Sequence, residues 1–151
     1  MSFGTGSTRE SSRESWWRWL AWSFLVGALA DLGFGLGILF MAERLAPILG
    51  VALPRGTTRV YLDLCGLFLV ALGGLYLMVS AWPKRMAPVA AWATLLRIGG
   101  FTLFAGAAFS GRGTSSFWHL AEVDAVFGFT HLILIRLAAG GLLTALRGKV
   151  G

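Results

Sequence analysis

Ionisable side chains inside long apolar stretches are the residues of this sequence best suited to chemistry. Asp31, Arg97, Asp124 and His131 each lie within a run dominated by Leu, Ala, Phe, Gly and Val. A charge at the centre of a bilayer costs about 2.5–3.5 kcal/mol on insertion scales, so such residues face the interior of a bundle, pair with one another or serve a function. This set of acids and bases is suited to passing a proton or binding a polar headgroup.

Depth along the helices indicates which of these side chains can meet. Counted at 1.5 Å per residue from the expected cytoplasmic helix ends, Arg97 and His131 lie at about 13 Å and 12 Å. Asp31 lies at about 18 Å and Asp124 at about 22 Å on the same scale. An Arg side chain extends several ångströms along its own stem. We therefore expect Arg97 to pair with Asp31, with Asp124 as a further partner, in either a structural cluster that fixes the bundle or a functional polar pocket.

Three further ionisable residues lie nearer the ends of the apolar runs. We expect Asp63 and Glu122 to be hydrated near the outer surface, and Arg136 to extend to the lipid headgroups at the inner surface. They form a secondary polar set.

No pattern of residues indicates a cofactor, a metal or a reaction. A b-type haem held by His131 needs a facing ligand, and His119 lies about 18 Å away along the same helix. No Cys, His or carboxylate cluster has zinc spacing. No phosphate loop, nucleophile elbow or Ser/His/Asp set is present either, so we expect a non-catalytic protein with no cofactor and no metal.

Four apolar stretches must position these side chains, at residues 19–41, 60–82, 89–110 and 119–143. Each has the length of about 20 residues that a helix needs to cross a membrane. Apolar residues make up 56% of the chain and charged residues only 13%, about half the charged content of soluble domains. The sequence predicts an all-α integral membrane protein, a four-helix transmembrane bundle.

Basic residues predict the orientation of this bundle. The N-terminal arm, the 83–88 link and the tail carry more Lys and Arg than the other two loops, which favours cytoplasmic N and C termini. We expect a flexible arm at 1–15, a transmembrane domain at 16–146 and a basic tail at 147–151. The basic residues are scattered, which argues against nucleic-acid binding.

The connections and the small residues predict how the spans pack. The connection 42–59 is expected to lie on the membrane surface or fold back over the bundle, and the short 83–88 link to make the second and third spans antiparallel neighbours. Small residues allow close approach of helices in lipid, and the expected packing positions are Gly33, Gly37, Gly73, Gly74, Gly99 and Gly100. Indole rings prefer the headgroup level, and the expected interface anchors are Trp16, Trp17, Trp19 and Trp22.

Several local motifs resemble a known family. They are Tyr61-Leu-Asp63-Leu-Cys65-Gly66-Leu-Phe68, then Gly73-Gly74-Leu-Tyr76-Leu, a Pro/Lys/Arg turn, and the paired signatures Asp31-x-x-Phe34-Gly35 and Asp124-x-x-Phe127-Gly128. Together they cover roughly residues 30–135 and resemble small bacterial four-helix membrane proteins described as DoxX-like. This resemblance implies a multi-pass protein of a bacterial inner membrane. Most such proteins have no established activity, and some relatives are linked to quinone-coupled sulfur oxidation or oxidative-stress complexes. The resemblance supplies no catalytic residue, and it assigns no role to Arg97 or His131.

Three functions are compatible with these features. The first is a non-catalytic membrane subunit or scaffold that contacts lipid and assembles with itself or with other membrane subunits. The second is a small carrier or proton-linked permeation protein built on the Asp/Arg/His cluster. The third is a quinone- or lipid-interacting accessory of a membrane redox system, which rests on the resemblance alone.

Overall fold

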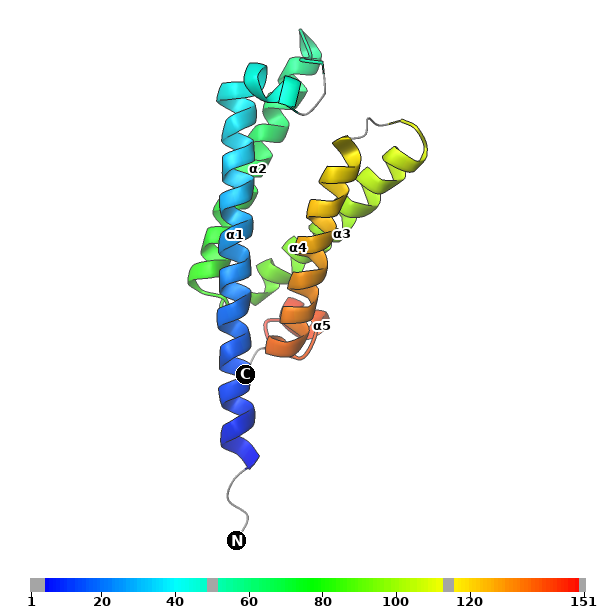
Figure 1. Cartoon of the computed structure of the whole chain (residues 1–151). Coiled ribbons are helices and arrows are strands. Elements are labelled where there is room, and N and C mark those ends of the chain that lie inside the picture. The colour runs from blue at the N-terminus through cyan, green and yellow to red at the C-terminus, as the bar shows by residue number, and fades with distance from the viewer. Residues whose placement is uncertain (1–4, 49–51, 113–115, 150–151) are drawn as a thin grey trace.

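Two long helical hairpins make up the protein (Figure 1). The computed structural model describes residues 5–48, 52–112 and 116–149, with side chains described from residue 10 onward. The first hairpin consists of α1 (Thr5–Ile48) and α2 (Thr57–Ala81), and the second of α3 (Ala87–Phe109) and α4 (Ser116–Ala139), followed by the short α5 (Leu142–Leu146). The described residues contain no strand, so the protein is all-helical.

Three of these helices are long and apolar enough to cross a membrane: α1 over Glu10–Ile48, α2 and α3. This agrees with a multi-pass membrane protein. The helix of the fourth predicted span, α4, is 24 residues long but does not belong to this group. It carries Glu122, Asp124, His131 and Arg136 along its length, which lowers its apolar character.

The first predicted span ends where α1 bends. Met41 has non-helical dihedral angles (φ −134°, ψ 22°) inside α1. The chain then continues as a short helical segment that folds back on the span. The evidence is that a Cβ added at Gly37 would lie 2.7 Å from Leu45 Cδ1. Part of the predicted 42–59 connection is therefore helical and packs on its own span, while residues 49–51 lie outside the described part of the chain.

The N-terminal arm, predicted to be flexible, is helical from Thr5 onward, and residues 1–4 lie outside the described part. Two tertiary contacts account for the order of the residues that adjoin the bundle. Arg13 Nε donates a hydrogen bond to the backbone oxygen of Ala138 (3.2 Å), and Lys84 forms an ion pair with Glu14. A cation at the C-terminal end of α4 also suits the helix dipole.

These contacts place the beginning of the bundle, the α2–α3 link and the end of α4 at one end of the molecule (Figure 1). The fourth predicted span differs at this end, since it was expected to run to residue 143. The helix ends at Ala139 because Gly140 and Gly141 adopt positive φ (82° and 148°), a conformation that side chains disfavour. The chain then turns into α5, whose Ala145 is buried.

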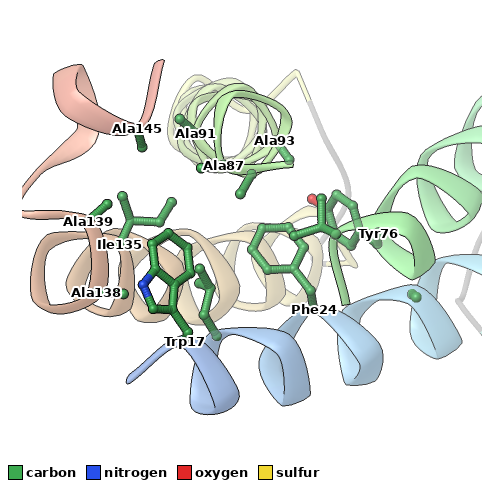
Figure 2. Packing of buried hydrophobic residues seen from close by; sticks show 14 residues of the cluster. Trp17, Phe24, Tyr76, Ala87, Ala91, Ala93, Ile135, Ala138, Ala139 and Ala145 are labelled. Carbon is green, nitrogen blue, oxygen red and sulfur yellow. The ribbon is translucent and has the colours of Figure 1, made fainter. Parts of the chain in front are cut away.

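The core lies mainly at this same end (Figure 2). Trp17 and Phe24 of α1 point toward alanines of α3 and toward Ile135 of α4. The buried α3 positions in this core are small, namely Ala87, Ala90, Ala91 and Ala93. Small residues allow close packing, and the helix on which α3 packs most extensively is α4.

The hairpins make their main contact through α1 and α4. The second and third spans, expected to be neighbours, touch each other much less, and Figure 1 shows α2 and α3 diverging from their short link. Within the first hairpin the backbones approach closely, since a Cβ added at Gly35 would lie 2.7 Å from the backbone oxygen of Gly66.

Candidate functional site

Arg97 lies at the centre of a buried polar cluster. Its Nη2 contacts both carboxylate oxygens of Asp31 at 2.5 Å, and its Nη1 donates to Asp124 Oδ1 at 2.7 Å. Its Nε donates to the hydroxyl oxygen of Tyr76 at 3.1 Å. We refer to these four residues as the Arg97 cluster. All three guanidinium nitrogens are therefore engaged, in the planar arrangement that suits paired carboxylates.

Each long helix contributes one member of the Arg97 cluster. Asp31 comes from α1, Tyr76 from α2, Arg97 from α3 and Asp124 from α4. The charged members are 5%, 7% and 8% exposed for Asp31, Arg97 and Asp124 respectively, and Tyr76 is fully buried. Buried charges need both pairing and hydrogen bonds, and this cluster supplies them by joining all four helices.

Glycines create the space that the cluster occupies. A Cβ added at Gly100 of α3 would lie 2.1 Å from Asp124 Oδ2, so the carboxyl group fills the place of a side chain there. On α4, a Cβ at Gly128 would lie 3.3 Å from Arg97 Cβ, and on α1 one at Gly27 would lie 3.1 Å from the Tyr76 ring. The ion pairs therefore depend on close helix approach at these positions.

His131 borders the cluster within a group of aromatic rings. Its imidazole stacks on Phe24, with ring centroids 3.9 Å apart and planes 6° from parallel. The ring centroids of Tyr76 and Phe127 lie 6.1 Å and 5.9 Å from that of His131. The same two rings also contact the Arg97 guanidinium, whose Cζ lies 5.4 Å from the Tyr76 centroid and 5.5 Å from the Phe127 centroid. His131 is thus a neighbour of the cluster through two shared rings.

The two ring nitrogens of His131 are fully buried and have no hydrogen-bond partner of normal geometry among the described residues. The backbone of Ser23 makes a polar contact with the ring that falls short of this geometry. A buried polar atom without a partner costs about 1–3 kcal/mol. The position therefore carries an energetic cost that a Leu or Phe would not.

The secondary polar residues lie apart from the Arg97 cluster. Asp63 accepts a hydrogen bond from Arg59 Nε at 2.9 Å, one helical turn away on α2, and both side chains are partly exposed. Glu122 is exposed and lies 3.5 Å from His119 Nδ1. Arg136 is exposed in the last turn of α4.

The glycines expected at packing positions fall into two groups. Gly73 and Gly100 face other helices closely, and Gly37 faces Leu45 of its own helix. A Cβ added at the other three would meet no atom within 4 Å, namely at Gly33, Gly74 and Gly99. These three face open space on this chain.

The four expected interface anchors also divide by burial. Trp19 and Trp22 are each 62% exposed. Trp17 instead lies in the core at 3% exposure, with Trp16 packed against that core. The four tryptophans are spread over nearly two helical turns and cannot all face outward, and the helix turns Trp17 inward.

Sequence reasoning did not include Tyr76 or Phe24 in the site. A usable signal existed for Tyr76, because a phenol in the middle of an apolar span needs a hydrogen-bond partner. Phe24 carried no such signal, since a phenylalanine in an apolar run is indistinguishable from its neighbours.

The chemistry of the site follows from these contacts. Each of the three guanidinium nitrogens of Arg97 contacts a residue of another helix, so the cluster links the four long helices. Among the described residues, no group of three or more His, Cys, Asp or Glu side chains is placed to hold a metal ion. No protein-family model, no curated protein and no solved structure matches the chain significantly.

Proposed function

We propose that this protein is a non-catalytic integral membrane subunit or scaffold whose helices are joined by the Arg97 cluster. The engagement of all three Arg97 nitrogens by residues of α1, α2 and α4 carries this proposal. A guanidinium with all three nitrogens engaged by other helices in this way contributes to the geometry of the bundle.

In this proposal α4 is the fourth span. Its buried Asp124 is paired inside the protein with Arg97 at 2.7 Å, and buried pairing of this kind is how membrane helices accommodate ionisable residues. The outer Glu122 is exposed near the beginning of the helix, where headgroups and water are close in a spanning arrangement.

We further propose that both termini are cytoplasmic and that the membrane is a bacterial inner membrane. The arm and the 83–88 link meet at one end through the Lys84–Glu14 pair, and Arg13 reaches the end of α4 there. The Lys and Arg residues gathered at this end favour the cytoplasmic side. The motifs that resemble DoxX-like proteins agree with this location.

The partners of such a subunit are lipid and other membrane helices, including copies of this chain. Large apolar side chains cover the outward faces of α2 and α3, for example Phe68 at 64% and Leu103 at 66% exposure. Gly74 and Gly99 lie on these same helices and face open space, where another helix can approach closely.

Native mass spectrometry of the full chain, extracted gently from its membrane, tests the proposal. We expect a homo-oligomer or a defined complex with another membrane protein. A Cβ added at Gly99 or at Gly74 enters open space, so Gly99→Leu and Gly74→Leu are the variants that report which face the partner covers. A strict monomer that co-extracts with no protein contradicts the scaffold function.

A further inference from the structure

The Arg97 cluster contains one more acid than base. Asp31 and Asp124 carry two negative charges when ionised, whereas Arg97 supplies one positive charge and stays protonated in proteins. Tyr76 is neutral in its ordinary state. All members are buried, and an uncompensated charge in a low-dielectric interior is strongly unfavourable. Neutrality of the cluster requires one further positive charge.

The hydrogen bonds distinguish the two acids. Both oxygens of Asp31 are within 2.5 Å of Arg97 Nη2, which favours its ionised form. Asp124 receives a hydrogen bond from Arg97 on Oδ1 only, at 2.7 Å. Its other oxygen, Oδ2, lies against the backbone of Gly100. Oδ2 is therefore the carboxylate oxygen that Arg97 leaves free.

We propose that Asp124 binds one exchangeable proton on Oδ2, which makes the Arg97 cluster a proton-binding site inside the helical bundle. This assignment goes beyond the scaffold function, and it holds whether or not the protein assembles with a partner.

His131 provides an independent reason to connect the cluster with proton binding. It is fully buried, and its ring nitrogens lack partners of normal geometry. It lies two helical turns from Asp124 on the same helix, and the rings of Tyr76 and Phe127 contact both His131 and Arg97. A buried imidazole, a group that can take up a proton, thus borders the cluster through two shared rings, at about 10 Å along α4 from Asp124.

The groups that control this site come from every long helix. Asp31 of α1 favours the proton on Asp124 by its negative charge, and Arg97 of α3 opposes it. Tyr76 of α2 lies between Arg97 and His131. Removal of either aspartate leaves one acid for one base, so the remaining acid no longer needs a proton for neutrality.

Infrared difference spectroscopy of the full chain in lipid nanodiscs tests this proposal. We expect a carbonyl stretch of a protonated carboxylic acid that shifts in D₂O and disappears as the pH is raised. Asp124→Asn and Asp31→Asn should each lose this band, because either change balances the cluster. Asp63→Asn, which alters the partly exposed acid paired with Arg59, is the matched control and should retain it.

A second pair of variants locates the proton on Oδ2. Gly100→Ala places a methyl group against this atom and should shift the band, whereas Gly99→Ala enters open space and should not. The two aspartate variants are independent, so failure of one to fold leaves the other as the test. Absence of the band at every pH at which the protein is folded, or its persistence in both aspartate variants, overturns the proposal.

Discussion

Gly100 and Gly99 offer the most direct test of the packing around the Arg97 cluster. Gly100→Ala introduces a Cβ 2.1 Å from Asp124 Oδ2 and 3.0 Å from its Cγ. Both distances are too short for contact, so the carboxyl group must move away. Asp124 is held by Arg97 Nη1 at 2.7 Å, and its displacement weakens that bond. Gly99→Ala meets no atom within 4 Å.

The two variants should change the free energy of unfolding in opposite directions. Loss of a hydrogen bond to a charged group costs about 1.5–3 kcal/mol, while replacement of Gly by Ala inside a helix gains about 0.5–1 kcal/mol. We therefore expect Gly100→Ala to lower the free energy of unfolding by about 1–2 kcal/mol. Gly99→Ala should raise it by up to about 1 kcal/mol.

Reversible unfolding in mixed micelles of mild detergent and dodecyl sulfate, followed by tryptophan fluorescence, measures this difference. A double-mutant cycle with Asp124→Ala isolates the cause, because the penalty of Gly100→Ala should vanish once the carboxyl group is removed. If Gly100→Ala is as stable as Gly99→Ala, or if its penalty persists without the carboxyl group, the described approach of α3 and α4 is refuted.

Three further predictions concern stability and use the same unfolding measurement. Arg97→Gln leaves the two buried acids Asp31 and Asp124 without their cation and should cost about 3–5 kcal/mol. An unchanged unfolding midpoint contradicts the burial of the pairs. Gly73→Ala places a Cβ 2.7 Å from Leu32 of α1 and should cost about 1–3 kcal/mol through overpacking. Gly74→Ala enters open space and should not destabilise the protein. Equal effects of the two variants refute the α1–α2 contact. Trp17→Ala removes a core side chain and should cost about 3–5 kcal/mol, while the exposed Trp19→Ala should stay within about 0.5 kcal/mol; the reverse order contradicts the orientation of α1.

The long helices could be predicted from the sequence because hydropathy is a strong local signal. The predicted runs 60–82 and 89–110 differ from α2 and α3 by only a few residues at each end. The end of α4 was missed by several residues, since Gly140 and Gly141 look like further small residues of a membrane helix until their positive φ is known. Helix at the N-terminal arm was also missed, because its order depends on contacts with residues far away in the chain.

For the candidate site, counting depth along the helices was sufficient to predict that Arg97 lies close to Asp31. Depth says nothing about rotation, however, and rotation decides which side of a helix a residue faces. This is why Trp17 and Trp19 could not be distinguished, and why Gly99 and Gly100 were grouped together although only Gly100 faces α4. The stacking of His131 on Phe24 depends on the packing of α1 against α4, which no local pattern encodes.

The order of the Arg97 cluster along the chain has a consequence for biogenesis. In the proposed topology the spans leave the ribosome in sequence, so Asp31 is already in the bilayer when the segment with Arg97 arrives, and Asp124 follows later. The Arg97–Asp31 contact at 2.5 Å is then available to retain α3 in the membrane before α4 has been made. Asp124 joins the cluster only when α4, the last long helix, is inserted. The cluster therefore gains its second acid at the same step at which the bundle is completed.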